Sequence, residues 1–202
     1  PSRMELSNLK KKRKVAVRGH KLMKDKRDEM VRRFIVYVRR NRTLREEVEQ
    51  KLASAMQGFV LARASMRAQA VEEALCYPAR PAEIKVSAQH VLSVVVPKLE
   101  LASVGKVELP YGIVGTSAEL DAAVQAFAEL LPLLVELAEV EKTCNRLADE
   151  IEKTRRRVNA LEYVMIPQFD EAIRTIKMKL DENERGNLTR LMKTKEMLAQ
   201  KE

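Results

Sequence analysis

The sequence predicts an all-α fold, a long antiparallel two-helix coiled coil with a small β-hairpin-like knob between the helices. Apolar residues recur every seven positions in two separate stretches, which is typical of helices that pack along a seam. Aromatic residues make up only 4% of the chain and charged residues 33%, a composition typical of long helices. We therefore expect an N-terminal long helix over residues 1–75, a β/turn knob over 76–116 and a C-terminal long helix over 117–202.

The first stretch predicts one long helix, because residues 3 to 75 contain no proline and only two glycines, Gly19 and Gly58. A helix of about 70 residues would be about 105 Å long. Such a helix is not stabilised inside a compact globule, so it needs an equally long partner. Its predicted seam consists of Met23, Met30, Tyr37, Leu44, Leu52 and Phe59.

The middle segment breaks the helical pattern with four prolines and three glycines between residues 76 and 116. Short alternating or β-branched runs at 83–87, 90–96 and 104–109 predict two or three short strands. A segment of this length is too small for an independent domain. We interpret it as a knob that closes the two helices into a hairpin.

The second helix is expected to begin at a capping-box pattern formed by Thr116 and Glu119. Pro132 and Pro167 should each bend it, because proline lacks a backbone donor. After Pro167 the apolar pattern slides by one position, which we attribute to the drift of a straight helix against a strict heptad. The predicted seam consists of Leu137, Cys144, Ile151, Val158, Met165 and Ala172.

A single antiparallel register would bring the two seams together, because facing residues in a helical hairpin keep a constant offset. The expected pairs are Phe59 with Leu137, Leu52 with Cys144, Leu44 with Ile151, Tyr37 with Val158, Met30 with Met165, and Met23 with Ala172. The same register sets the basic run 10–14 near the acidic residues Asp181, Glu182 and Glu184.

Positive charge is concentrated at one end of the chain: residues 1–45 hold 17 Lys and Arg but only 4 Asp and Glu. Such a region needs an acidic partner or full solvation. The expected register also opposes two arginine runs, and we predict that they form a basic bearing or docking surface or, equally, a solvated helix face. The residues are Arg39, Arg40, Arg42, Arg155, Arg156 and Arg157.

The sequence carries no constellation typical of catalysis or cofactor binding, so no cofactor and no metal are expected. His20 and His90 lack a telling neighbour and are expected to be solvated surface residues. Cys76 and Cys144 have neither metal spacing nor a disulfide framework. Basic residues without interleaved aromatics argue against nucleic acid. No apolar run approaches the roughly 18 residues of a membrane span, so direct membrane insertion is not expected.

Two segments carry a family resemblance. The segment E-V-E-K-T-C-N-R-L-A-D-E-I-E-K-T-R-R-R-V-N-A-L-E-Y-V-M-I-P (139–167), with I-K-M-K-L-D-E-N-E-R (176–185), resembles the D subunit of V-type and A-type ATPases and ATP synthases. The segment P-S-R-M-E-L-S-N-L-K-K-K-R-K-V-A-V-R-G-H-K-L-M-K-D-K-R-D-E (1–29) resembles the same family.

The resemblance implies a non-catalytic central-stalk subunit, a rotor axle that transmits torque and has no active site of its own. The implied partners are a hexameric head of catalytic and non-catalytic subunits, the small F subunit of the central stalk and a socket subunit on the membrane rotor ring. The implied location is cytoplasmic, peripheral to the membrane as part of a membrane-bound complex. The coupling ion, proton or sodium, and the direction, pump or synthase, stay open.

Two alternatives remain beside this interpretation. The gamma subunit of F-type ATP synthases also has terminal helices that form a coil, but its larger α/β domain does not fit within residues 76–116. A coiled-coil scaffold unrelated to ATPases would form a stable homo-oligomer alone, whereas a rotor axle is expected to be a monomer that binds one small partner.

Overall fold

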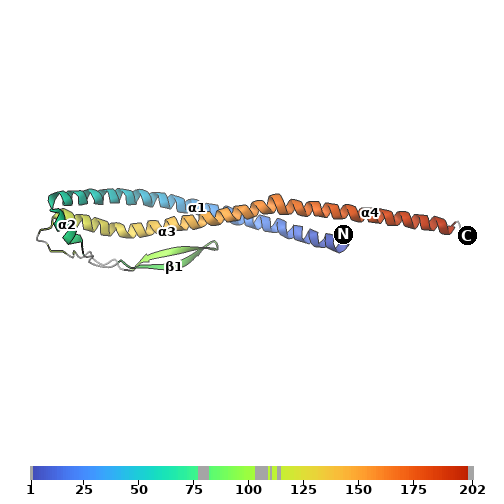
Figure 1. Ribbon diagram of the computed structural model, residues 1–202, viewed down its shortest axis with the longest axis horizontal. Coiled ribbons are helices and arrows are strands. Elements are labelled where there is room, and N and C mark those ends of the chain that lie inside the picture. The colour runs from blue at the N-terminus through green and yellow to red at the C-terminus, as the bar shows by residue number, and fades with distance from the viewer. Residues whose placement is uncertain (1, 77–81, 103–108, 110, 113–114, 200–202) are drawn as a thin grey trace. The chain divides into compact units, whose positions relative to one another are not determined.

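A computed structural model describes residues 2–76, 82–102, 109, 111–112 and 115–199 (Figure 1). Two units make up the chain: Pro1–Glu29 with Ile151–Glu202 form the first, and Met30–Glu150 form the second. The elements are α1 (Arg3–Ser65), α2 (Ala68–Leu75), β1 (Ile84–Val91), β2 (Val94–Leu101), α3 (Ala118–Ala160), a π-helical turn (Leu161–Met165) and α4 (Ile166–Ala199). The predicted all-α coiled coil with a small hairpin is confirmed.

The first unit pairs the beginning of α1 with the end of α3, the π-helical turn and α4. The helix α1 begins at a cap, because the amide of Glu5 donates to Oγ of Ser2 at 3.1 Å. Arg3 forms an ion pair with Glu184 and Arg13 with Asp170, both on α4. As the residue number rises along α1, the number of the residue it contacts on α4 falls, so the two helices run antiparallel.

The second unit pairs the rest of α1 with α3. Gly58 lies against α3: a Cβ atom added to it would be in ordinary van der Waals contact with Cβ of Ala123, at 3.9 Å. Buried residues of α1 in this unit include the small Ala55 and Ala62, at 2% and 0% exposure. Small side chains allow two helix backbones to approach closely, and this approach places the apolar core of the unit between α1 and α3.

The helix α1 ends ten residues earlier than the expected single helix, at Ser65. Arg67 adopts an extended backbone with ψ at 139°, which no α-helix can continue through, and α2 begins at Ala68. The hydroxyl of Ser65 donates to the carbonyl oxygen of Ala62 at 2.9 Å. The expectation of a continuous helix to residue 75 is therefore wrong.

A compact core closes this end of the second unit. Ala62, Ala74 and Leu120 are buried together, and Phe59, Met66, Tyr111 and Val124 pack against them. The helix α3 begins here, with Ser117 as its cap: the amide of Leu120 lies 3.4 Å from Oγ of Ser117. The cap is thus one residue later than the expected Thr116–Glu119 box.

The strands β1 and β2 form an antiparallel hairpin with register from Ile84↔Leu101 to Val91↔Val94. Leu92 and Ser93 form its two-residue turn with φ of 49° and 70°. The expected strand at 90–96 is therefore wrong, because the chain reverses in its middle. The third expected run, 104–109, lies outside the described residues except for Leu109.

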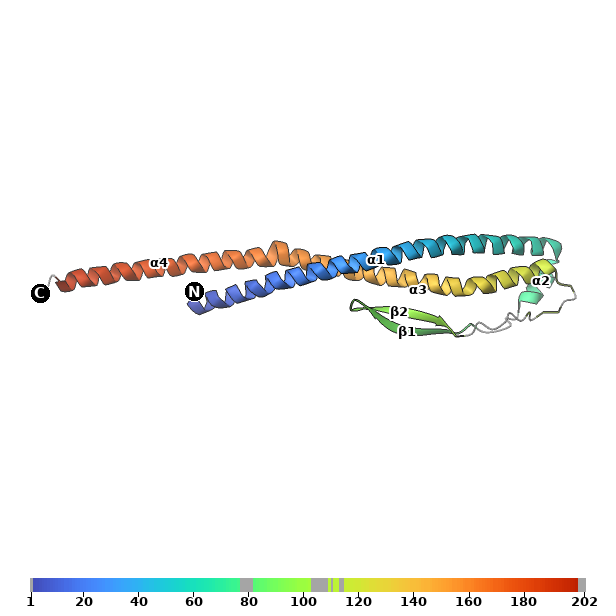
Figure 2. The ribbon, with the colours of Figure 1, turned by 180° about the vertical axis from the view of Figure 1, so that it is seen from behind.

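The hairpin lies alongside α3, as both ribbon views show (Figures 1 and 2). The amide of Leu99 donates to Oε2 of Glu139 at 2.8 Å. Counting from the turn, Leu99 occupies a pair whose backbone amides point away from β1, so its donor is available to a partner outside the sheet. Val94 and Val96 are buried, at 8% and 3% exposure. The hairpin thus docks on the coil as well as connecting its two helices.

Candidate partner-binding surfaces

The predicted seam residues differ widely in exposure. Met30 and Val158 are fully buried, at 0% and 1%, and Cys144 is 9% exposed. The half-buried members are Met23, Tyr37, Leu44, Phe59, Leu137, Ile151 and Ala172. Leu52 and Met165 are exposed, at 38% and 43%. These last two positions are available to partners instead of facing the seam.

Leu52 is exposed because the contact face of α1 is centred elsewhere. Val48, Ala55 and Ala62 are 4%, 2% and 0% exposed and recur every seven residues. Leu52 lies at the edge of this face. The heptad pattern correctly predicted the apolar side of the helix. Within that side, the residues that face α3 are Val48 and the small Ala55 and Ala62, which allow a close approach.

Met165 is exposed because it ends the π-helical turn. The amide of Ile166 donates to the carbonyl of Leu161, five residues earlier. Pro167 has no N–H to continue the regular ladder, and a π turn inserts one extra residue into it. The slide of the apolar pattern therefore arises at this turn and not from gradual drift. The residues after it that the slid pattern marked are half-buried: Phe169, Ile173, Ile176 and Leu180.

The register within each unit differs from the expected one by roughly one to two heptads. Phe59 meets the ring of Phe127, with centroids 6.5 Å apart, and not Leu137. Arg13 pairs with Asp170, far from the acidic residues at 181–184 that were expected beside it. Heptad periodicity repeats after every two turns, so it allows several registers. The contact between Phe59 and Phe127 and the ion pair between Arg13 and Asp170 show which register each unit adopts.

The predicted basic residues are exposed, and three of them have acidic partners. Arg40 pairs with Glu136 across the second unit. Arg42 pairs with Glu46 one turn along its own helix, at 2.9 Å. Arg156 pairs with Glu152 in the same way. Arg39, Arg155 and Arg157 are exposed as well. Because the two arginine runs belong to different units, the shared bearing surface stays a prediction.

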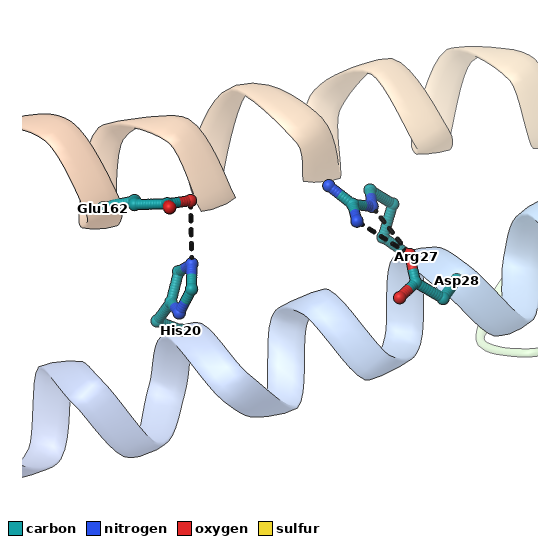
Figure 3. Close-up of polar contacts among 4 residues, drawn as sticks. All are labelled: His20, Arg27, Asp28 and Glu162. Carbon is teal, nitrogen blue, oxygen red and sulfur yellow. Dashed lines mark hydrogen bonds and ion pairs between the residues drawn. The ribbon is translucent and has the colours of Figure 1, made fainter.

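His20 was expected to be a solvated surface residue, but it contacts Glu162 of the opposite helix (Figure 3). Its Nε2 lies 3.2 Å from Oε2 of Glu162, and its side chain is 19% exposed. Glu162 belongs to the π-helical turn, so this contact connects α1 to the irregular part of the opposite helix. Nearby, the guanidinium of Arg27 donates to Oδ1 of Asp28 at 3.0 and 2.8 Å. Of these contacts, the one between His20 and Glu162 joins α1 to the π-helical turn of the opposite helix.

The last part of α4 presents a series of exposed apolar side chains. Arg3, the first residue of α1, forms an ion pair with Glu184, and α4 continues from there to Ala199 (Figure 1). The exposed residues are Leu188 at 56%, Leu191 at 66%, Met192 at 64%, Met197 at 50% and Leu198 at 64%. These residues recur at helical spacing, and this pattern could have predicted an apolar surface beyond the predicted seam.

Across the described part of the chain, no group of three His, Cys, Asp or Glu residues could hold a metal ion. None of the helices there is long and apolar enough to cross a membrane. Both cysteines are free thiols. Burial, and to a lesser degree the charge of Glu141, raises the pKa of the Cys144 thiol. That thiol is therefore a packed apolar group, whereas Cys76 is exposed.

Helices paired in opposite directions, a hairpin docked on one of them and a helix end with exposed apolar side chains define an antiparallel coiled-coil protein. A family model for the D subunit of ATP synthases matches residues 5–196. The chain belongs to this ATP synthase D-subunit family, which confirms the resemblance. Membership places the chain among the subunits of V-type ATP synthases and sets aside the unrelated scaffold.

Individual relatives agree with this assignment. The chain is 55% identical to the V-type ATP synthase D subunit of a Thermoanaerobacter species over 199 residues, 98% of this chain and 95% of the relative. It is 53% identical to the V-type ATP synthase D subunit of Acetivibrio thermocellus, over 98% of this chain and 90% of the relative. It is 51% identical to the V-type ATP synthase D subunit of Clostridium botulinum, over 100% and 95%.

Proposed function

We propose that the chain is the central-stalk subunit, the rotor axle, of a rotary V-type or A-type ATPase. In this role it transmits torque between an ATP-hydrolysing or ATP-synthesising hexameric head and an ion-translocating membrane ring. It performs no chemistry itself. A two-stranded coil presents different residues in different directions, so its rotation would carry each catalytic site through open and closed states in turn.

The exposed apolar side chains at the end of α4 support this proposal most directly. Burying a large apolar side chain is worth about 1.5–3 kcal/mol, so five such side chains on one helix end favour a partner that encloses them. The helix α4 continues for about four turns past Glu184, the residue that pairs with Arg3. The family resemblance also implies that both chain ends are inserted into the hexameric head, and an apolar helix end agrees with such insertion.

The proposed partners are the catalytic and non-catalytic subunits of the head, the small F subunit of the central stalk on the side of the coil, and a socket subunit on the membrane rotor ring. The proposed location is cytoplasmic and peripheral to the membrane, within the membrane-bound complex. Exposed apolar residues of α1 in the second unit, among them Met56 and Val60 at 51% and 61% exposure, are candidate contacts for this small F subunit.

Rotation can be tested on the assembled complex, because the two cysteines differ in reactivity. Cys76 is exposed and Cys144 is buried, so a biotin–maleimide label attaches to Cys76. With the head fixed to a surface and a bead on the label, ATP should drive the bead around in one direction. Cys76→Ser serves as the labelling control. A labelled complex that hydrolyses ATP while the bead stays still would exclude the axle role.

The helix end has its own test within the same complex. Leu188→Gln with Leu191→Gln should reduce the yield of head-bound chain, because both remove exposed apolar contact area. Lys193→Gln with Lys195→Gln is the matched control on the same exposed end. Equal yields for both variants would show that this end does not enter the head through its apolar face.

A further inference from the structure

A groove of about 620 Å³ lies on the surface of the first unit, where α1 and α4 meet. Its lining residues are Lys10, Arg13, Lys14, Val17 and Arg18 of α1, and Asp170 and Ile173 of α4. Four of the seven carry positive charge and one carries negative charge. The groove therefore combines an excess of positive charge with two apolar side chains, Val17 and Ile173.

The single acid of the groove is already neutralised. Asp170 accepts hydrogen bonds from Nε and Nη2 of Arg13, one to each carboxylate oxygen. Among the described residues, no carboxylate lies within ion-pair distance of Lys10, Lys14 or Arg18. Like charges four residues apart on a helix destabilise it, so this arrangement has a cost that an acidic partner would remove.

The spacing of these cations indicates the form of the partner. Lys10, Lys14 and Arg18 follow one another at four-residue intervals, which places them about 6 Å apart along one face of α1. A phosphate group would meet one or two of them. A second helix with carboxylates at the same four-residue interval would meet all three, and apolar residues beside those carboxylates would cover Val17, which is 42% exposed.

We infer that this groove binds an acidic amphipathic helix of a partner protein, with carboxylates on Lys10, Lys14 and Arg18 and an apolar side chain on Val17. The inference rests on the proposed function only for the source of the helix, which would be a subunit of the complex. The binding itself depends on the groove alone.

The test uses the full chain and a synthetic probe. The probe is a fluorescent helical peptide of about 18 residues with Glu at three successive four-residue intervals and Leu beside them. Binding is followed by anisotropy at low and high salt. The variant Lys10→Gln with Lys14→Gln and Arg18→Gln should weaken the affinity about tenfold, since exposed ion pairs contribute modestly each. Added salt should weaken binding of the unchanged chain as well.

The matched control removes the same total charge from the same stretch of helix. Lys11→Gln with Lys12→Gln and Lys21→Gln changes exposed residues that do not line the groove, and it should change the affinity less than about twofold. Val17→Ser should weaken binding without any change of charge. Circular dichroism of each variant confirms that the coil stays folded.

Several results would overturn the inference. They are no binding of the probe, equal loss in the control variant, or equal affinity for a peptide with Glu but no Leu. Equal affinity for tripolyphosphate or single-stranded nucleic acid would reduce the groove to a general anion surface. If the peptide does not bind but the complex rotates, the groove inference is wrong and the axle role stands. If the peptide binds but the chain never joins the complex, the axle role is wrong and the groove inference stands.

Discussion

The phenyl rings of Phe59 and Phe127 meet edge to face, with centroids 6.5 Å apart and planes inclined by 76°. This contact fixes the register of α1 against α3 in the second unit, because a shift by one heptad would separate the rings by about 10 Å. The register in turn decides which charged residues of the two helices can pair, including Arg45 with Glu141 at 3.0 Å.

We expect a thermodynamic coupling between Phe59 and Phe127. Phe59→Ala should reduce the free energy of unfolding by about 2 kcal/mol, since the half-buried ring leaves a cavity. A double-mutant cycle with Phe127→Ala should give a coupling energy of about 0.5–1.5 kcal/mol in urea unfolding. The same cycle with Leu137→Ala is the control and should give no coupling. A larger coupling to Leu137 would contradict the register.

Replacing Thr154 by valine should make the folded protein more stable. Its side chain is 1% exposed, and its hydroxyl has no hydrogen-bond partner among the described residues. Thr154→Val keeps the shape and removes the buried polar atom, so the free energy of unfolding should rise by about 1 kcal/mol. Thr154→Ser keeps the hydroxyl and should lower it by about 1 kcal/mol. A loss of stability in the valine variant would show that the hydroxyl has a partner.

The turn of the hairpin should accept residues suited to positive φ. Leu92 and Ser93 both occupy the left-handed region, which costs about 1–2 kcal/mol for a residue with a Cβ. Leu92→Asn with Ser93→Gly should therefore slow hydrogen exchange in the hairpin and raise its stability by about 1–2 kcal/mol. Leu92→Val, a β-branched control, should do the reverse. Unchanged exchange in both variants would argue against this turn geometry.

Tyr111 should give the fold a pH dependence in the alkaline range. Burial, and then its hydrogen bond to Asp121 at 2.9 Å, raises the pKa of Tyr111 to about 12. The unfolded chain ionises Tyr111 near pH 10, whereas the folded chain keeps its proton, so stability from this group is complete below pH 10 and is lost as the pH rises to about 12. Urea unfolding of Tyr111→Phe should lack this part of the decline. Parallel pH profiles for both proteins would refute the assignment.

The arginines of α3 should matter more for the complex than for the coil. Arg156 and Glu152 are both exposed and form a pair one turn apart, which is worth about 0.3–0.5 kcal/mol. Changing Arg155, Arg156 and Arg157 to Gln should therefore alter coil stability by less than about 1 kcal/mol while it reduces ATPase coupling or complex yield. Lys142→Gln with Arg146→Gln and Lys153→Gln is the matched control on the same helix. Unchanged coupling with unchanged yield would rule out the bearing surface.

The sequence predicted the kind of structure well, because its signals are local. Seven-residue periodicity identified two helices that need partners, and the prolines and glycines between them located the hairpin segment. Pro167 marked the place where the apolar pattern slides. These features depend on residues that are close together in the sequence, so local sequence patterns are enough to predict them.

Other features needed information that local patterns lack. The turn at Leu92–Ser93 carries neither glycine nor asparagine, so nothing in the sequence marked it. The end of α1 at Ser65 has no proline beside it, and the break there lets Ala74 of α2 pack with Ala62 and Leu120. His20 appeared solitary in the sequence, yet Glu162 lies against it from the opposite helix.

The sequence by itself determined the helices, their antiparallel pairing as a class of structure, and the family through two long matching segments. Only the tertiary structure decided the register, the docking of the hairpin on α3 through Leu99 and Glu139, and the groove between Lys10 and Ile173. The physical reason is that a heptad repeat is satisfied equally by registers two turns apart. Close contacts between residues distant in sequence, such as Phe59 with Phe127, select one of them.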